Sequence, residues 1–325
     1  MTVEQVDFSA DPRAEVDEVS GASWPNVTVV VPVHGDRGLL ARTARALAAQ
    51  DYPGQVDVVL ADNGDNGSLR PAVEALPFVQ LVSEERPGSY VARNTAVACA
   101  RGEVLAFTDA DCLPEPGWLR AAVRALQEQD GPAFVGGAVH LFSQDPARPT
   151  LAELWDSLNF LQQESYVTSG GWAATANMVT LRSTFDEVGP FDERLKSGGD
   201  REWGERASRL GVRAVYCAAA VVRHPARRRM SELHAKAHRV TRGDVETRRR
   251  AGLPMFDPGV LRAGLNPSLR STYRRAGELP GASVHQHLRY VAVALWMRYY
   301  VLGAKVWQVL RTSGAAARRP AGGSR

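Results

Sequence analysis

The sequence has few cysteines and no signal-like start. Its three cysteines, Cys99, Cys112 and Cys217, are an odd number at unmatched spacings, which excludes a disulfide framework and a CxxC zinc site. The first residues are acidic and lack the basic start and apolar run of a secretory signal. Few cysteines and no signal fit a reducing compartment, so we expect a cytoplasmic protein.

Two nucleotide-binding fingerprints are also missing. The stretch after the first apolar segment reads PVHGDRG, where a nicotinamide-dependent oxidoreductase ordinarily carries GxGxxG. The pattern GxxxxGK followed by Ser or Thr occurs nowhere in the chain, which excludes a P-loop NTPase.

The composition is that of a globular protein with a basic C-terminal third. The 325 residues are 44% hydrophobic and 23% charged, which excludes wholesale disorder and a multi-span membrane protein. The net charge of +3 conceals an asymmetry, because residues 223–325 contain 21 Lys or Arg against 5 Asp or Glu. This region favours an anionic partner, and a nucleotide diphosphate, an anionic membrane and nucleic acid all fit the charge.

Apolar and amphipathic segments alternate along the first part of the chain. Residues 26–33 are a β-branched run typical of a strand covered on both faces. Helical spacing follows over 39–48, strands are predicted at 56–61 and 104–108, and a helix at 89–100 lies between them. Alternating βα units predict an α/β fold with a mostly parallel, Rossmann-like sheet flanked by helices.

Further helices and extended segments are predicted between residues 118 and 224, without the regular alternation of strand and helix. Periodic patterns predict helices over 118–129, 151–167 and 201–210, and extended chain over 212–217 and 218–224.

We expect four parts in the chain. Residues 1–25 read as a flexible N-terminal segment, 26–225 as a catalytic domain, 226–312 as a basic helical extension, and 313–325 as a disordered tail.

Acidic residues follow two of the predicted strands. Asp62 ends one strand, and Asp109 and Asp111 come directly after another. Ligands of open α/β sheets bind beyond the carboxyl ends of the strands, so these residues are site candidates. Carboxylates two residues apart suit a divalent cation such as Mn²⁺ or Mg²⁺ that also binds substrate phosphates. The alternative is an ordinary turn, in which Asp is also favoured.

Five segments together resemble the family 2 glycosyltransferases, which have the GT-A nucleotide-sugar fold. The matching stretches are VVVPVHG at 29–35, ADNG at 61–64, RPGSYVARNTAVACARGEVLAFTDADC at 86–112, GGWAATANM at 170–178 and VGPFDERLKSGGDREWGERASRLG at 188–211. They occur in family order and cover residues 27–224. The resemblance implies transfer of a sugar from a nucleotide diphosphate sugar, most simply a UDP-sugar, to an acceptor hydroxyl with inversion.

The resemblance also implies roles for individual residues. Contacts with the nucleotide sugar fall on these positions: Pro32, Val33, His34, Asp62, Arg93, Asp109 and Ala110. The metal would be held by Asp111 together with Asp109 and His224, although a structural role for that histidine is the alternative.

The general base is predicted to be Asp200. It matches the aspartate of the family's Glu-Asp motif, although Gly199 replaces the preceding Glu and Glu202 lies two residues later. This leaves open whether Asp200 or Glu202 contacts the acceptor. Asp200 could also serve as a helix N-cap, and the two roles are compatible.

Other candidates rest on weaker patterns. Asn177, within a stretch of small residues, matches positions at the junction of donor sugar and acceptor, or else belongs to a tight internal loop. Trp203 is assigned to the acceptor side and Trp172 to the core. The run containing Arg228 follows His224 closely enough to reach the pyrophosphate, although basic runs are usually solvated.

Residues 284–310 have apolar residues at helical spacing but are interrupted by Arg289, Arg298 and Lys305. They cannot comfortably span a bilayer, and they either pack on the rest of the protein or lie on an anionic membrane.

The predicted partners are a nucleotide diphosphate sugar and a hydroxyl-bearing glycan, lipid-linked or small-metabolite acceptor. Nucleic acid is the less expected partner. The alternative function is a catalytically degenerate protein that binds membrane or nucleic acid through its basic region. The presence of Asp109, Asp111 and Asp200 argues against it.

Overall fold

The computed structural model describes residues 23–34, 37–64, 78–250, 252–255, 268–279 and 282–317. Most of the predicted flexible lead-in and part of the predicted tail lie outside these ranges. The last helix extends to Ala317, past the predicted boundary at residue 312.

The described strands form one eight-stranded sheet in the order β3-β2-β1-β4-β7-β6-β8-β5. Their bounds are β1 Val27–Val33, β2 Val56–Asp62, β3 Val79–Ser83, β4 Val104–Thr108, β5 Leu113–Pro114, β6 Ala133–Phe142, β7 Asn177–Leu181 and β8 Arg213–Pro225. From β3 to β4 all neighbours are parallel, as the alternating pattern predicts. Beyond β4 the sheet is mixed, because β7 runs antiparallel to both β4 and β6, whereas β6 and β8 are parallel.

Helices cover both faces of the sheet and continue into the C-terminal part of the chain. They are α1 Arg37–Ala48, α3 Ser89–Cys99, α4 Trp118–Gln127, α5 Leu151–Asn159, α6 Gln163–Thr168, α7 Arg182–Val188, α8 Gly199–Arg209, α9 Met230–Arg250, α11 Leu269–Ala276 and α12 Val284–Ala317.

The valine-rich β1 lies at the centre of the core. Val27, Val29 and Val31 pack into the cluster under α1 and α4, whereas Val30 packs into the cluster on the other face with α3, α7 and α8. All four side chains are fully buried. A strand covered on both faces explains why the run shows no alternation of polar and apolar residues.

The prediction of a single helix over 151–167 is wrong, because two helices, α5 and α6, occupy this range. Thr150 starts α5 with a capping box to Glu153, and α5 ends at Asn159. Leu161 then takes a φ of 50°, and the turn it makes sends Gln163 at the start of α6 into the core. The Gln163 amide donates to the carbonyls of Ala174 and Asn177, and its oxygen accepts from the Ala174 N–H. These bonds to the chain before β7 explain the break.

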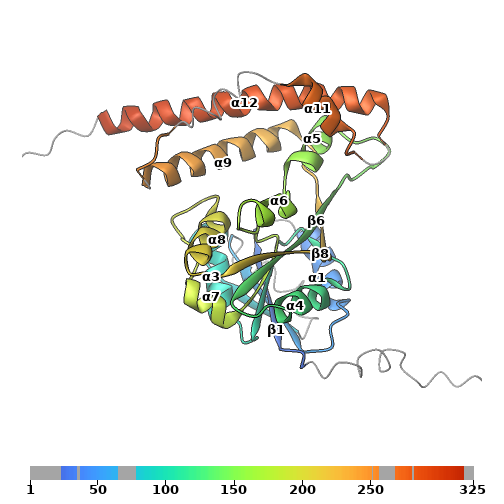
Figure 1. Cartoon of the computed structure of the whole chain (residues 1–325), viewed down its shortest axis with the longest axis vertical. Helices are drawn as coiled ribbons and strands as arrows, with labels where there is room; N and C mark the ends of the chain where they lie inside the picture. The colour runs from blue at the N-terminus through green and yellow to red at the C-terminus, as the bar shows by residue number, and fades with distance from the viewer. Residues whose placement is uncertain are drawn as a thin grey trace, which may run out of the picture.

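The C-terminal helices pack against one another beside the sheet domain. Figure 1 shows α9 and α12 side by side, with α5 beneath α12 and beside one end of α9. The inner face of α12 is buried, including Tyr290, Val293 and Met297, which pack with residues of α5, α9 and α11. In the part of the chain that the structure describes, no helix has both the length and the apolarity to traverse a bilayer.

Candidate active site

A cleft of about 1270 Å³ opens where β1, β2 and β4 end. One wall consists of residues that follow these strands, including His34, Asn63 and Asp109. The facing wall comes from α9, including Lys236 and Arg239. The cleft is therefore built by chain segments about 200 residues apart.

The turn after β4 is held in place by hydrogen bonds. The Cys112 N–H donates to the Asp109 carbonyl at 3.0 Å and closes the turn. The Thr43 hydroxyl on α1 lies 2.7 Å from the carbonyl oxygens of both Ala110 and Cys112. The backbone of the Asp-Ala-Asp segment is thus fixed, and its carboxylates line the cleft.

Asp109, Asp111, Cys112 and His224 form a group that fits a divalent cation. One ligand atom from each lies within 4.8 Å of the others. His224 Nδ1 lies 2.7 Å from the Pro225 carbonyl, so its N–H is used there and Nε2 keeps a free lone pair. Nε2 is 3.6 Å from an Asp111 oxygen. Burial raises the pKa of the Cys112 thiol far above its ordinary value, so two carboxylates and an imidazole are the available ligands.

The local charges favour a cation as well. Burial and the neighbouring Asp109 raise the pKa of Asp111, although His224 opposes them. Arg93, which is 4% exposed, forms an ion pair with Asp109. One arginine therefore compensates one of two adjacent carboxylates, and a bound cation would remove the remaining repulsion.

Asp200 lies in the first turn of α8 on the same cleft. Its carboxylate accepts hydrogen bonds from the Tyr90 hydroxyl at 3.2 Å and from the Arg201 N–H at 3.0 Å. Burial raises the pKa of Asp200. Glu202 also lines the cleft, but one of its oxygens is paired with Arg206 at 2.7 Å. Of Asp200 and Glu202, only Glu202 forms an ion pair with an arginine among the described residues.

Comparisons with known proteins agree with this geometry. The family model for glycosyl transferase family 2 matches residues 28–189. Glycosyltransferase AglE of Haloferax volcanii is 31% identical over 231 residues, covering 69% of this chain and 75% of that protein. The chain belongs to glycosyl transferase family 2.

The other relatives of this family 2 glycosyltransferase are more distant. Pre-mycofactocin glycosyltransferase of Mycobacterium tuberculosis is 29% identical over 227 residues, 67% of this chain and 46% of that protein. The mannosyltransferase PcManGT from Pyrobaculum calidifontis, solved with GDP-Man and Mn²⁺, superposes with a TM-score of 0.55 at 21% identity, over 93% of this chain and 77% of that one. GalNAc-T7, solved with UDP, GalNAc and Mn²⁺, has a TM-score of 0.50 at 18% identity and covers 63% of this chain and 44% of its own. The sheet therefore has the GT-A fold.

Most predicted site residues of the glycosyltransferase line the cleft. The residues in this group are Pro32, Val33, His34, Arg93, Asp109, Ala110, Asp111, Asp200, Glu202 and His224. Asp62 is not among the described lining residues: it is 3% exposed, and its carboxylate accepts from the Gly64 N–H at 3.3 Å.

The assignment of Trp203 to the acceptor side is wrong. Trp203 is fully buried among Phe134, Phe185 and Phe191, and its N–H donates to the Gly189 carbonyl at 2.9 Å. Trp172, predicted as a core residue, instead lines the cleft, where it stacks on Tyr166 with 4.2 Å between the ring centroids. Trp203 therefore lies in the core and Trp172 on the cleft, which is the reverse of the expectation.

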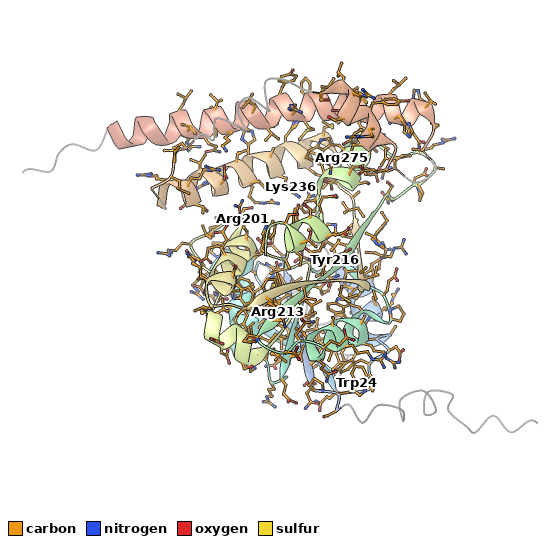
Figure 2. All side chains as sticks on the ribbon, in the orientation of Figure 1. Trp24, Arg201, Arg213, Tyr216, Lys236 and Arg275 are labelled. Atoms are coloured by element: carbon orange, nitrogen blue, oxygen red, sulfur yellow. The ribbon has the colours of Figure 1, made fainter. Side chains whose placement is uncertain are left out.

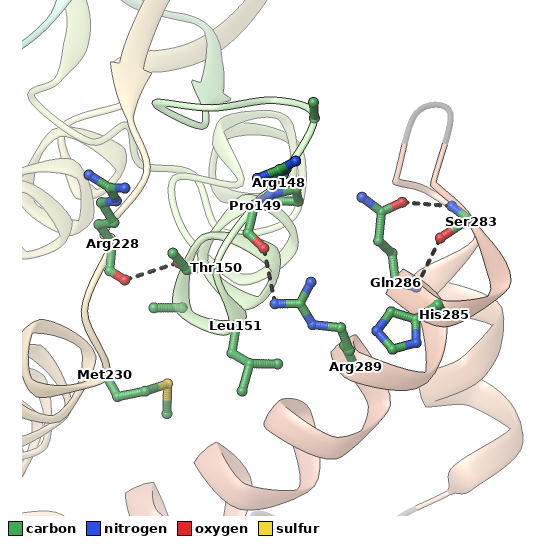
Figure 3. A pocket seen from close by; sticks show the side chains of 12 residues that line it. Arg148, Pro149, Thr150, Leu151, Arg228, Met230, Ser283, His285, Gln286 and Arg289 are labelled. Carbon is green, nitrogen blue, oxygen red and sulfur yellow. Dashed lines mark hydrogen bonds between the residues drawn. The ribbon is translucent and has the colours of Figure 1, made fainter.

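Asn177 and Arg228 are also placed differently from the prediction. Asn177 is fully buried, donates to the carbonyls of Ala138 and Ala220 and accepts from the Trp118 indole, so its side chain joins β6 and β8. The side chain of Arg228 donates to Gln144 and lines a separate surface pocket of about 790 Å³ between α5 and α12, shown in Figure 3.

Several cleft residues were not singled out from the sequence, among them Asn63, Tyr90, Lys236 and Arg239. Asn63 ties the strand ends together by donating to the Glu84 and Arg86 carbonyls and accepting from the Gly88 N–H. Arg227, in the basic run after His224 that was expected to reach the pyrophosphate, also lines the cleft.

Proposed function

We propose that this transferase moves a sugar from a nucleoside diphosphate sugar to an acceptor hydroxyl, with inversion and with Asp200 as general base. The observation that supports it is that Asp109, Asp111 and His224 gather within metal-binding distance on the cleft that also contains Asp200. A single displacement needs one base and one stabilised leaving group, and this cleft offers one of each.

Asp109, Asp111 and His224 would hold Mn²⁺ or Mg²⁺. When bound, such an ion supplies positive charge that stabilises the departing diphosphate. Arg227 lines the same cleft and carries a further positive charge, although it is paired with Asp156 at 3.1 Å.

Asp200 would accept the proton of the acceptor hydroxyl. The acceptor oxygen then forms a bond to the anomeric carbon of the donor, and the bond to the diphosphate breaks, so that the nucleoside diphosphate leaves with the bonding electrons. Burial supports this role, because a raised pKa brings the carboxylate closer to the working pH of a base. The alternative base, Glu202, is partly neutralised by Arg206.

The donor class is tested by thermal shift with UDP, GDP and TDP in the presence of Mn²⁺, with and without EDTA. UDP is the first expectation, and GDP is included because the neighbouring mannosyltransferase structure contains GDP-Man. Selective binding to the folded state raises the melting temperature.

The base is tested with Asp200→Asn, which should lower turnover about 10²- to 10⁴-fold with little change in nucleotide affinity. Glu202→Gln is the matched variant and should have the smaller effect. If Glu202→Gln is the more damaging change, the base is reassigned.

A second proposal concerns the outward face of α12, which we propose lies on an anionic membrane. Exposed positions with apolar or small side chains recur on it every three or four residues: Val284, Leu288, Ala292, Trp296, Tyr299, Gly303, Val306 and Leu310. The larger side chains of this stripe are each at least 37% exposed. The stripe is about 40 Å long at 1.5 Å per residue. The helix contains neither Asp nor Glu, and its basic residues are Arg289, Arg298 and Arg311 together with Lys305, which is buried and paired with Asp244.

An apolar stripe with aromatic and basic neighbours suits an interface of anionic lipid. The full chain should float with phosphatidylglycerol vesicles and not with phosphatidylcholine vesicles, and Leu288→Glu with Trp296→Glu should abolish flotation. The alternative is that the stripe binds a second copy of the chain. In that case the chain does not float, its molecular mass in solution is that of a dimer, and the same two substitutions reduce this mass to that of a monomer.

A further inference from the structure

Lys236 is a cation whose buried ammonium nitrogen forms no hydrogen bond with a carboxylate among the described residues. It extends from α9 toward the sheet domain, as Figure 2 shows, and lines the cleft. Its ammonium nitrogen is buried, has no hydrogen-bond partner among the described residues, and rests on the ring of Phe160. Because an ammonium group without acceptors is costly to bury, a residue of this kind calls for an explanation.

The surrounding charges make its position less favourable still. Burial lowers the pKa of Lys236 well below its ordinary value, and Arg227 lowers it further. Arg239 lines the same wall, and burial and Arg227 lower its pKa too. Three cations thus share one side of the cleft.

The nearby carboxylates already have partners. Asp156 accepts hydrogen bonds from the side chain and the backbone N–H of Arg227 at 2.9 to 3.2 Å. Asp244 on α9 is paired with Lys305 at 2.7 Å and with Arg248 at 3.1 Å. No described carboxylate, Asp200 included, forms a hydrogen bond with the Lys236 ammonium group, so an anionic ligand is the natural complement.

Lys236 and Arg239 line the same cleft as Asp200. Burial and Arg227 lower the pKa of Lys236, whereas the charges of Asp156 and Asp200 raise it. The ring of Phe160 also meets His224 of the metal-binding group, with 5.8 Å between the ring centroids and 83° between the planes. Because the donor diphosphate is proposed to bind at Asp111 and His224, we assign Lys236 and Arg239 to the other substrate.

We propose that Lys236 and Arg239 bind a phosphate group carried by the acceptor. The proposal rests on the transferase function above and names the acceptor class: a molecule that presents a hydroxyl to Asp200 and a phosphate to α9. A phosphate suits this site because it carries up to two negative charges and accepts hydrogen bonds from both side chains. The phosphate belongs either to a lipid-linked carrier or to a soluble sugar phosphate.

The test uses the full chain loaded with Mg²⁺ and the nucleoside diphosphate that it binds best. Calorimetric titration with octyl phosphate and with inorganic phosphate should show binding that Lys236→Met weakens at least tenfold and Lys236→Arg largely retains. Arg242→Met, an exposed arginine on the same helix, is the charge-matched control and should change nothing. Octyl phosphate binding more tightly than inorganic phosphate would indicate a lipid carrier, and equal binding a soluble one.

Three further readouts decide between this proposal and its competitors. Lys236→Met should raise the melting temperature of the free chain, because it removes a buried uncompensated charge. Nucleotide affinity should change less than twofold, and an equal loss of nucleotide and phosphate binding would overturn the proposal in favour of a donor role. Binding of neither phosphate by the wild-type chain would also overturn it. Asp111→Ala separates the two hypotheses, since it should lose nucleotide while keeping phosphate.

Discussion

Burial raises the pKa of Asp200, the proposed base, and the hydrogen bond from the Tyr90 hydroxyl lowers it. Tyr90→Phe removes only the hydroxyl and keeps the ring, which is 6% exposed and packs against Phe191. Burial raises the pKa of Tyr90, so the hydroxyl stays protonated and remains a donor across the working pH range. Its loss should raise the pKa of Asp200, for which this bond is one of the lowering influences.

The size of the shift follows from the geometry. A hydrogen bond to a charged group is worth about 1.5 to 3 kcal/mol. The oxygens here are 3.2 Å apart, beyond the usual range for O–H···O bonds, so the low end applies. That corresponds to about one pKa unit, since one unit equals about 1.4 kcal/mol.

The assay is kcat/KM as a function of pH at saturating metal. The base must be deprotonated, so activity falls as the pH drops through its pKa, and the substitution should move this acid limb up by about one pH unit while leaving the plateau largely intact. Tyr52→Phe, which removes a hydroxyl bonded to the Pro25 carbonyl, is the control and should leave the limb in place. An acid limb that does not move, or moves down, would refute the reasoning.

Three other changes test the site and the core. Asp111→Ala should abolish metal-dependent nucleotide binding in calorimetry, whereas Asp186→Ala, an exposed aspartate on α7, should not; equal behaviour of the two would remove Asp111 from the site. Trp203→Ala should lower the free energy of unfolding by about 3 to 5 kcal/mol in urea titrations, as for other buried aromatic residues, and a cost below about 1 kcal/mol would contradict its core position. Asn177→Ala leaves the Trp118 N–H and two carbonyls buried without this partner and should cost about 2 to 4 kcal/mol, with nucleotide affinity of the remaining folded protein unchanged.

The sequence predicts best where the physics is local. The β-branched run of β1 and the helical spacing that follows it locate a strand and a helix. Both are predictable because the pattern of apolar residues within a short stretch of sequence indicates which faces are buried. The positions of Asp109 and Asp111 follow in turn, since strand ends of a parallel sheet meet at one edge.

Prediction fails where distant segments decide the outcome. The antiparallel direction of β7 depends on its pairing with β4, about 70 residues away. Trp172 and Trp203 are chemically alike, and only the packing of α8 and the loop before β7 decides which one reaches the cleft. Lys236 belongs to an Arg-rich stretch that resembles solvated surface, and its burial becomes visible only when α9 is placed over the cleft.

The cleft has one wall from the segments after β1, β2 and β4 and the other from α9, which follows the family match at 28–189. If the first wall binds the donor and α9 binds the acceptor, as proposed above, the two substrates are recognised by separable stretches of the chain. Grafting the helices after residue 225 from a relative onto this sheet would be expected to redirect which molecule is glycosylated while the same activated sugar is still consumed. Changes confined to the sheet's edge would alter the sugar and leave its destination alone.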